Sequence, residues 1–329
     1  MSLESMLSTP LVSIIIPTYN RPAYLKEAIA SAVQQTYRNI EVIVSDDCSP
    51  DSPQAIVDSF HDSRIYFRRH STNLGMFANT LSGFCDAKGK YVVSLNDDNA
   101  LNSDFLEKLI PPLEANSELV MAFCDHCIIN ADSAIDPLET EKNTGRWKRD
   151  RLQEGIYQPF YKQGLVDEAV PTSVAAVIRK AMIDWDHFPA GAGVYWDLYT
   201  TYLACCTGRG AYYTSERLAQ YRVHDQSETA VSGSQNAKAK QRKASAEIFC
   251  YESFLDDKRL KEFHACFKQR WAHANTTMGI ALLRLENPTE AQVYLLQALR
   301  SQKTDLRTIV ALALSFIPLS CYAFKFLIL

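Results

Sequence analysis

The sequence has no excess of positive charge: Lys and Arg total 34, Asp and Glu total 38, and the formal net charge is −4. A general nucleic-acid-binding protein normally carries a clustered basic excess, so we expect no nucleic-acid partner. Residues 1–10 lack an apolar run of signal-peptide length, so we expect a cytoplasmic protein. Apolar residues make up 47% of the chain and charged residues 22%, which excludes an intrinsically disordered chain and predicts a sizeable core.

The nine cysteines lack a regular spacing, and without export their thiols are expected to stay reduced. Cys124 and Cys127 could form half of a zinc site. No second Cys/His pair follows at zinc-finger spacing, and both cysteines lie inside the apolar run 119–129. We therefore favour buried strand thiols over zinc ligands.

The segment 308–329 concentrates the apolar residues at the carboxyl end, with 17 of 22. The uncharged stretch between Arg307 and Lys325 is 17 residues long, at the lower limit for a membrane-spanning helix, and Pro318 interrupts it. Three interpretations stay open: a spanning helix, a hairpin that docks or lies on a membrane surface, and a buried helix pair. The second one predicts a peripheral protein at the inner face of the membrane.

Short apolar runs alternate with helical patterns over the first 125 residues. This alternation predicts an α/β fold with a doubly wound, mostly parallel sheet and helices on both faces. The predicted strands are 11–16, 40–45, 65–69, 91–95 and 119–124, followed later by 174–178. The predicted helices start at Pro22 and cover 54–60, 76–85 and 103–109, the last one ending before Pro111.

Polar clusters follow four of these strands, at residues 18–20, 46–47, 96–98 and 125–126. Ligands of doubly wound sheets bind at the carboxyl ends of the strands, so these clusters are expected to form one site. Asp97 and Asp98 form a carboxylate pair on a tight turn, which suits Mg²⁺ or Mn²⁺ together with substrate phosphates. A solvated turn is the alternative for this pair alone.

Several motifs together closely resemble the nucleotide-sugar domain of glycosyltransferase family 2, and the resemblance covers roughly residues 10–227 in order. They are residues 11–20, 40–47, 88–98, Asn73 to Gly75 with Asn79, and Tyr221 to His224. The resemblance implies a GT-A fold and transfer of a sugar from a nucleotide diphosphate donor.

The resemblance also implies roles for residues around the donor. Pro17, Thr18, Tyr19 and Asn20 would line the nucleoside pocket, where Asn73 also belongs. Asp47 would accept a hydrogen bond from the imide N–H of uracil or thymine. Asp97 would approach the ribose, and Asp98 would bind Mn²⁺ or Mg²⁺ that bridges the diphosphate, within the family's DXD motif.

Asp197 matches the family position of the base that removes a proton from the acceptor hydroxyl, with inversion at the anomeric carbon. The alternative is a carboxylate that only stabilises the start of a helix. His224 resembles a family position near the metal, although a structural histidine is as plausible. Tyr195, Trp196 and Asp125 are candidate acceptor contacts, and core aromatics are the alternative for the first two.

The sequence departs from the family pattern in two places. Asn96 stands where many relatives carry a third acid, which leaves Asp98 intact. Trp196 precedes the candidate base, whereas relatives often have a second acid nearby, and this weakens the assignment of Asp197.

The predicted organisation is a catalytic domain at 1–227 and a helical region at 246–329. The catalytic domain would divide into a nucleotide-sugar half, about 10–125, and an acceptor half, about 126–227. A linker or mobile loop is expected at 228–245, where large apolar residues are scarce. In the helical region, 271–285 and 289–299 predict a hairpin similar to one tetratricopeptide unit, with no second copy.

These observations predict an inverting, metal-dependent glycosyltransferase that uses a UDP- or dTDP-sugar. Its acceptor would be a carbohydrate or lipid-linked glycan, in cell-envelope or extracellular polysaccharide synthesis. The first alternative is a non-catalytic scaffold that binds a partner through its helical region. A nucleotidyltransferase is disfavoured, because its phosphate loop would be rich in Gly, whereas Pro17 to Asn20 contains none.

Overall fold

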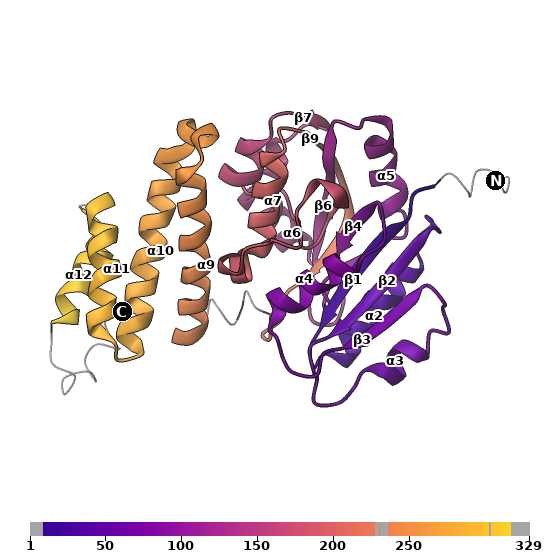
Figure 1. Ribbon diagram of the computed structural model, residues 1–329, viewed down its shortest axis with the longest axis horizontal. Coiled ribbons are helices and arrows are strands. Elements are labelled where there is room, and N and C mark those ends of the chain that lie inside the picture. Colours follow the sequence, from indigo (N-terminus) through magenta and orange to yellow (C-terminus); the bar gives the residue numbers. More distant parts are fainter. Residues whose placement is uncertain (1–8, 228–229, 231–235, 303, 317–329) are drawn as a thin grey trace. The chain divides into compact units, whose positions relative to one another are not determined.

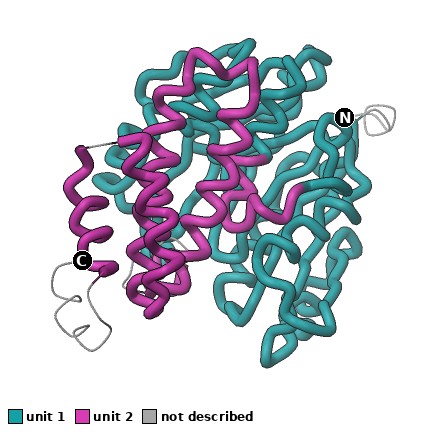
Figure 2. Tube along the Cα trace, turned by 60° about the vertical axis from the view of Figure 1, so that its left-hand side comes forward, with its two compact units in different colours: residues 1–188, 200–223 teal, residues 189–199, 224–329 magenta. Residues whose placement is uncertain are grey.

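The computed structural model describes residues 9–227, 230, 236–302 and 304–316. The chain divides into two compact units, Met1–Phe188 with Thr200–Val223, and Pro189–Tyr199 with His224–Leu329 (Figure 2). The last boundary between the units, after Val223, lies near residue 227, where we expected the catalytic domain to end. The short segment 189–199, which we expected in the catalytic domain, groups with the second unit instead.

One half of the sheet in the first unit is fully parallel. Its strands run in the order β3-β2-β1-β4, with every neighbouring pair parallel. They are β1 (Val12–Thr18), β2 (Ile40–Asp46), β3 (Ile65–Arg69) and β4 (Tyr91–Ser94), as the apolar runs predicted. Because all four point the same way, the segments that follow them meet at one edge of the sheet (Figure 1).

The other half of the sheet is mixed, and the described residues form nine strands in total. The strands β8 (Ala176–Arg179), β6 (Leu119–Ile129), β9 (Gly210–Arg222) and β5 (Ala100–Leu101) continue the order, and β7 (Gly155–Tyr157) pairs with β9. The pairing of β6 with β9 is parallel, and the remaining pairs are antiparallel. The sequence did not predict β5, β7 or β9.

Helices cover both faces of the sheet, as predicted. Ile14 and Ile16 of β1 pack in one core with α2 (Pro22–Val33) and α5 (Phe105–Ala115). Ile15 points the other way, toward α4 (Met76–Asp86), where Gly83 lies so close that a Cβ would come within 2.4 Å of the Ile15 Cγ2. The alternation of side chains along one buried strand therefore separates the two helical layers.

Two helix predictions need correction. The helix α5 continues through Pro111 and Pro112 to Ala115, because Leu113 beyond the prolines is fully buried in the core. The segment 130–150, for which the sequence analysis predicted no helix, contains the helix α6 (Pro137–Arg146). Its start signals are present, since Asp136 caps the backbone N–H of Glu139 and proline opens the first turn. Its only large apolar residue is the exposed Leu138, so no helical hydrophobic pattern marks it.

Short helices connect the remaining strands. The predicted strand at 174–178 is β8, which begins two residues later. The aromatic loop 185–196 contains a 3₁₀ helix, η4 (Ala190–Tyr195), which leads into α7 (Trp196–Cys206), the helix expected to open at Asp197. The division between the two units falls inside α7, after Tyr199.

The second unit is helical, as predicted. Its helices are α9 (Ala237–Asp256), η5 (Lys258–Phe263), α10 (His264–Arg284), α11 (Pro288–Ser301) and α12 (Leu306–Ser315) (Figure 1). The predicted hairpin is formed by α10 and α11, where Gly279 leaves only 2.5 Å between a would-be Cβ and Leu295 Cγ. The linker prediction is wrong for residues 237–245, which form the start of α9, whereas most of 228–235 lies outside the described residues.

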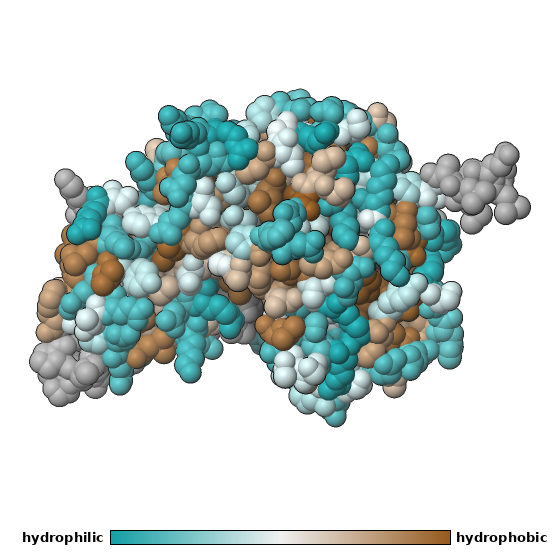
Figure 3. All heavy atoms as spheres, viewed as in Figure 1, coloured by the Kyte–Doolittle hydropathy of each residue, from teal (hydrophilic) through white to brown (hydrophobic). Residues whose placement is uncertain are grey.

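Part of the apolar segment 308–329 is structured. In α12, Thr308 and Ala311 are buried, and the Thr308 hydroxyl lies 2.5 Å from that of Thr276 on α10. Leu306, Ile309 and Phe316 are exposed, and hydrophobic surface is visible near α12 in Figure 3. Residues 317–329 lie outside the described part. Among the described residues, no helix is both long and apolar enough to span a membrane.

Candidate functional site

The candidate site begins where β1 and β4 end side by side. Thr18, the last residue of β1, donates a hydrogen bond from Oγ1 to Asp97 Oδ2 at 2.8 Å. The backbone N–H of Tyr19 points to the same oxygen, at 3.4 Å. Because parallel neighbours place their carboxyl ends together, residues 79 positions apart in the chain share one hydrogen bond.

Arg21 links the two carboxylates that follow β4. Its Nη1 lies 3.1 Å from Asp97 Oδ1 and 2.9 Å from Asp98 Oδ2. Burial and the neighbouring Asp98 charge raise the pKa of Asp97 to about 6, although Arg21 and Thr18 act in the opposite direction. Burial lowers the pKa of Arg21, but the two carboxylates outweigh it and the net shift is upward. One guanidinium thus serves two buried carboxylates.

This arrangement fits a divalent cation. Two adjacent carboxylates already hold a positive group, and Mg²⁺ or Mn²⁺ takes one or two carboxylates plus substrate phosphates. Within the described ranges, no group of three or more His, Cys, Asp or Glu residues is placed to hold a metal ion. The metal role of Asp98 stays a prediction.

Asp47 is fixed by the loop that follows β3. Its carboxylate accepts hydrogen bonds from the backbone N–H of Leu74, at 2.7 Å, and of Gly75, at 2.9 Å. Asn73 donates a hydrogen bond from Nδ2 to the Asp47 carbonyl oxygen at 3.1 Å. Two of the residues predicted to bind the nucleotide sugar therefore contact each other. Gly75 has a φ of 86°, which favours glycine at this turn.

The turn after β1 is held by serine and aspartate. Asn20 has a φ of 54°, and its backbone N–H donates to Ser49 Oγ at 2.8 Å. Ser49 in turn donates to the buried Asp46 at 2.5 Å. Pro17 lies within β1, and the Tyr19 side chain is 46% exposed, so it is accessible to a ligand.

Asn79, part of the family-like motif, has a structural role. It is buried, accepts a hydrogen bond from the Ser45 hydroxyl at 2.5 Å and donates to the Ser45 carbonyl at 2.9 Å. These two bonds attach α4 to β2.

Asp125 on β6 belongs to a separate, closed cluster. Its carboxylate accepts from Arg149 Nε at 2.6 Å, Thr144 Oγ1 at 2.7 Å and Arg217 Nε at 3.3 Å. Burial raises its pKa, but Arg149 and the hydrogen bonds bring the pKa below its usual value. Both carboxylate oxygens have protein partners, and the acceptor role of Asp125 stays a prediction. Cys124, before it, is buried in β6, as expected for a strand thiol.

Four predicted residues belong to the second unit: Tyr195, Trp196, Asp197 and His224. Asp197 lies in the first turn of α7, where its Oδ1 accepts from the Leu198 backbone N–H at 2.8 Å. The Tyr195 hydroxyl donates to Glu247 of α9, and Trp196 and His224 are buried. The base, metal and acceptor roles of these residues stay predictions.

Sequence reasoning missed two arginines. Arg21 directly follows the nucleoside motif, and Arg222 lies within the motif Tyr221 to His224. The fully buried Arg222 donates from Nε to the Asp98 carbonyl at 2.8 Å and from Nη1 to Ser133 Oγ at 2.8 Å. It also pairs with Glu27 of α2 at 2.5 Å, so it ties the Asp98 turn to α2 and to the loop after β6.

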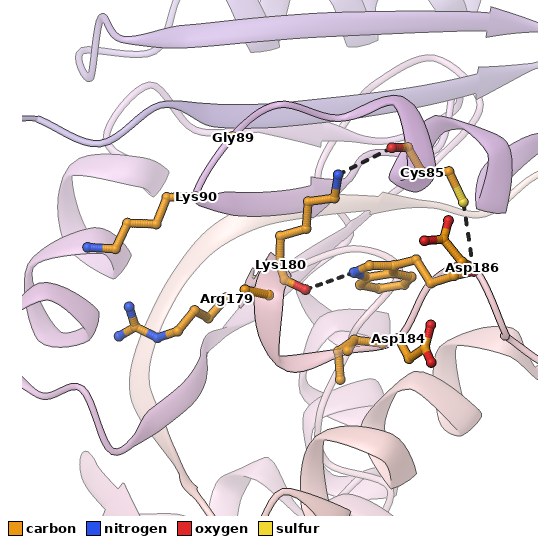
Figure 4. Close-up of a pocket in the computed structure, with 10 residues that line it drawn as sticks. Cys85, Gly89, Lys90, Arg179, Lys180, Asp184 and Asp186 are labelled. Atoms are coloured by element: carbon orange, nitrogen blue, oxygen red, sulfur yellow. Dashed lines mark hydrogen bonds between the residues drawn. The ribbon is translucent and has the colours of Figure 1, made fainter.

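A pocket of about 460 Å³ lies elsewhere in the first unit, near the start of β4 (Figure 4). Its cations are already used by the fold: Lys180 donates to the carbonyls of Cys85 and Ala87, and Arg179 donates to the Leu113 carbonyl at 2.7 Å. Asp97 follows the opposite, carboxyl end of β4. The pocket is therefore distinct from the candidate site.

The family follows from comparison with known proteins. Residues 13–181, slightly more than half of the chain, match the model described as glycosyl transferase family 2. The chain belongs to glycosyltransferase family 2. An uncharacterized glycosyltransferase of Rickettsia prowazekii is 33% identical over 156 residues, which are 47% of this chain and 48% of that protein.

A second relative has a more specific name. A Campylobacter jejuni protein named GalNAc(5)-diNAcBac-PP-undecaprenol beta-1,3-glucosyltransferase is 32% identical over 168 residues, 48% of this chain and 53% of the relative. The chain thus spans about half the length of these two family members.

Solved structures share the fold. Staphylococcus aureus TarS 1-349 with UDP-GlcNAc has a TM-score of 0.63 at 15% identity, covering 92% of this chain and 90% of that 1-349 chain. A Pyrobaculum calidifontis mannosyltransferase with GDP-Man and Mn²⁺ has a TM-score of 0.56 at 17% identity, covering 94% and 84%. This glycosyltransferase family 2 chain therefore has the GT-A fold that the motifs implied.

Proposed function

We propose that this protein is an inverting, divalent-metal-dependent glycosyltransferase. It would move a sugar from a UDP- or dTDP-sugar to a hydroxyl of a carbohydrate or lipid-linked glycan, in the synthesis of a cell-envelope or extracellular glycan. The observation that carries the proposal is the pair of carboxylates at the carboxyl end of β4, Asp97 and Asp98. Thr18 donates a hydrogen bond to Asp97, and the guanidinium of Arg21 contacts both carboxylates. Family membership adds the reaction class.

The first unit supplies the groups for donor binding. Asp47, whose carboxylate accepts from two backbone N–H groups, would accept a further hydrogen bond from the base. Asp97 accepts from a ribose hydroxyl, and Asp98 holds the divalent ion. Mg²⁺ or Mn²⁺, when bound, offsets the charge of the diphosphate on binding and on departure.

Asp197 is the proposed general base. Its carboxylate takes the proton from the acceptor hydroxyl while that oxygen attacks the anomeric carbon. The bond to the diphosphate breaks on the opposite side, so the configuration inverts. Such assistance is worth about 10²–10⁴-fold in rate. We further propose His224 beside the metal, and Tyr195, Trp196 and Asp125 on the acceptor side.

The relatives guide the choice of substrates. The name of one relative mentions undecaprenol, and the names of two solved structures mention UDP-GlcNAc and GDP-Man. The experiment below therefore includes a lipid-linked acceptor and several nucleotide sugars. An acceptor of this kind would place the protein at the inner face of the membrane. Segment 308–329 would then contact the membrane surface from the cytoplasmic side.

The test is a donor panel with the full chain: UDP-, dTDP- and GDP-sugars, with Mn²⁺, Mg²⁺ or a chelator, with and without an undecaprenyl-diphosphate-linked acceptor. We expect donor binding and turnover with a UDP- or dTDP-sugar that the chelator removes. Asp197→Asn should keep donor binding and lose transfer. Asp51 is exposed, and Asp51→Asn is the matched control, which should keep both. Transfer at the parental rate by Asp197→Asn would refute the base assignment. Absence of both binding and turnover with every donor would favour a scaffold.

A further inference from the structure

Arg21 touches both carboxylates of the proposed metal turn. It occupies the N-cap position of α2, directly before Pro22, so its backbone is fixed by the start of the helix. A single nitrogen, Nη1, lies within 3.1 Å of Asp97 and 2.9 Å of Asp98. The side chain itself is 23% exposed, whereas the two aspartates are 5% and 9% exposed.

A divalent ion on Asp98 would compete with this guanidinium. Both positive groups would bind the same pair of carboxylates, and at such short range they would repel each other. Arginine cannot relieve the conflict by losing its proton, because its guanidinium stays protonated in proteins. The guanidinium must therefore leave the oxygens that the metal takes.

The contacts indicate which partner moves. Asp97 is held by Thr18, and the Asp98 carbonyl by the buried Arg222. Arg21 has a long side chain that reaches solvent. A guanidinium also binds phosphate oxygens well, so a donor diphosphate offers it a new anionic partner.

We propose that Arg21 is a positioning residue, an internal cation that holds Asp97 and Asp98 until a divalent metal displaces its guanidinium toward the donor diphosphate. This inference rests on the proposed metal-dependent function. It has two consequences: Arg21 weakens the binding of metal alone, and it strengthens the linkage between metal and nucleoside diphosphate.

The first experiment measures Mn²⁺ binding to the full chain without nucleotide, from the electron paramagnetic resonance signal of free Mn²⁺. Arg21→Gln should bind Mn²⁺ about tenfold tighter than the parent, because the metal no longer displaces charge-assisted hydrogen bonds. Arg21→Lys should fall between them, since an ammonium lacks the planar fork of arginine. Asp98→Asn should lose Mn²⁺ binding in both backgrounds.

Arg64→Gln is the matched control. Arg64 pairs with Asp62 at 2.6 Å, has a side-chain exposure of 26%, and precedes β3 at the opposite edge of the sheet. Removing its charge should leave the Mn²⁺ affinity unchanged. Thermal melting with chelator shows that the variants are folded, and Mn²⁺ should raise the melting temperature of Arg21→Gln more than that of the parent.

The second experiment repeats the titration with UDP. UDP should increase the Mn²⁺ affinity of the parent more than that of Arg21→Gln. Mn²⁺ binding by folded Arg21→Gln that is no tighter than the parent's overturns the inference, even if the parent transfers sugar. If neither protein binds Mn²⁺, the inference fails together with the metal dependence. An equal UDP effect in both proteins overturns the transfer of Arg21 to the diphosphate.

Discussion

Two acidic clusters of the first unit use the same residue types with opposite results. Around Asp97 and Asp98, two carboxylates share one arginine that is largely buried, and the pKa of Asp97 rises to about 6. Around Asp125, one carboxylate has two arginines, and its pKa falls below the usual value. The ratio of charges separates them: in the first cluster two carboxylates face one arginine, and in the second one carboxylate faces two arginines.

The largest expected effect is on donor binding by the cluster of Asp97 and Asp98. Asp98→Ala should abolish metal-dependent donor binding, because the carboxylate proposed to hold the metal is lost. The fold should remain, since the residue lies on a turn whose carbonyl, not its side chain, receives Arg222. Calorimetric titration of UDP with and without Mn²⁺ measures the loss, and chelator-insensitive UDP binding by the parent would contradict the proposal.

In the closed cluster around Asp125, a substitution should lower the stability and leave donor binding unchanged. Arg149→Met leaves Asp125 buried with only the partly exposed Arg217 as a charged partner, and breaking a buried pair costs about 3–5 kcal/mol. Urea denaturation measures this loss of unfolding free energy. Donor binding per folded molecule should be unchanged, and a selective loss of donor binding with full stability would place Arg149 in the site instead.

The clusters also differ in how far the sequence predicted them. Thr18, Asp97 and Asp98 follow apolar strands of the parallel half, and the direction of such strands brings their ends together. Asp125 was predicted at a strand end too, but its partners Arg149 and Arg217 come from segments without a strong pattern. Arg149 lies in a 3₁₀ helix of three residues, η1 (Arg149–Arg151), and β9 carries Glu216 and Arg217 in its middle. Ion pairs between distant segments leave no periodic signal, which is also why Arg21 was missed.

The pH dependence of stability should sharpen the description of the closed cluster. Burial and Arg149 lower the pKa of His126 to about 3, from about 6.5 when unfolded. The unfolded chain then binds the proton first, so stability is lost as the pH falls below 6.5. Between pH 7 and pH 5 this histidine alone should cost about 2 kcal/mol.

His126→Asn is the variant for this measurement. It removes the titrating ring, so its unfolding free energy should fall less between pH 7 and pH 5 than that of the parent. Urea denaturation at both values gives the difference. Equal slopes for parent and variant would show that His126 is not buried in its neutral form.

The smallest effect is expected at an ion pair outside both clusters. Arg64 and Asp62 are 26% and 20% exposed and lie two residues apart, so solvent screens them and the pair needs no distant segment. Arg64→Gln should cost about 1 kcal/mol or less, without a change in metal affinity. If instead it matched the loss caused by Arg149→Met, burial would not be what distinguishes the clusters. The two clusters would then differ only in their ratio of charges. A double variant of Arg149 and Arg217, compared with the two single variants, could test this ratio.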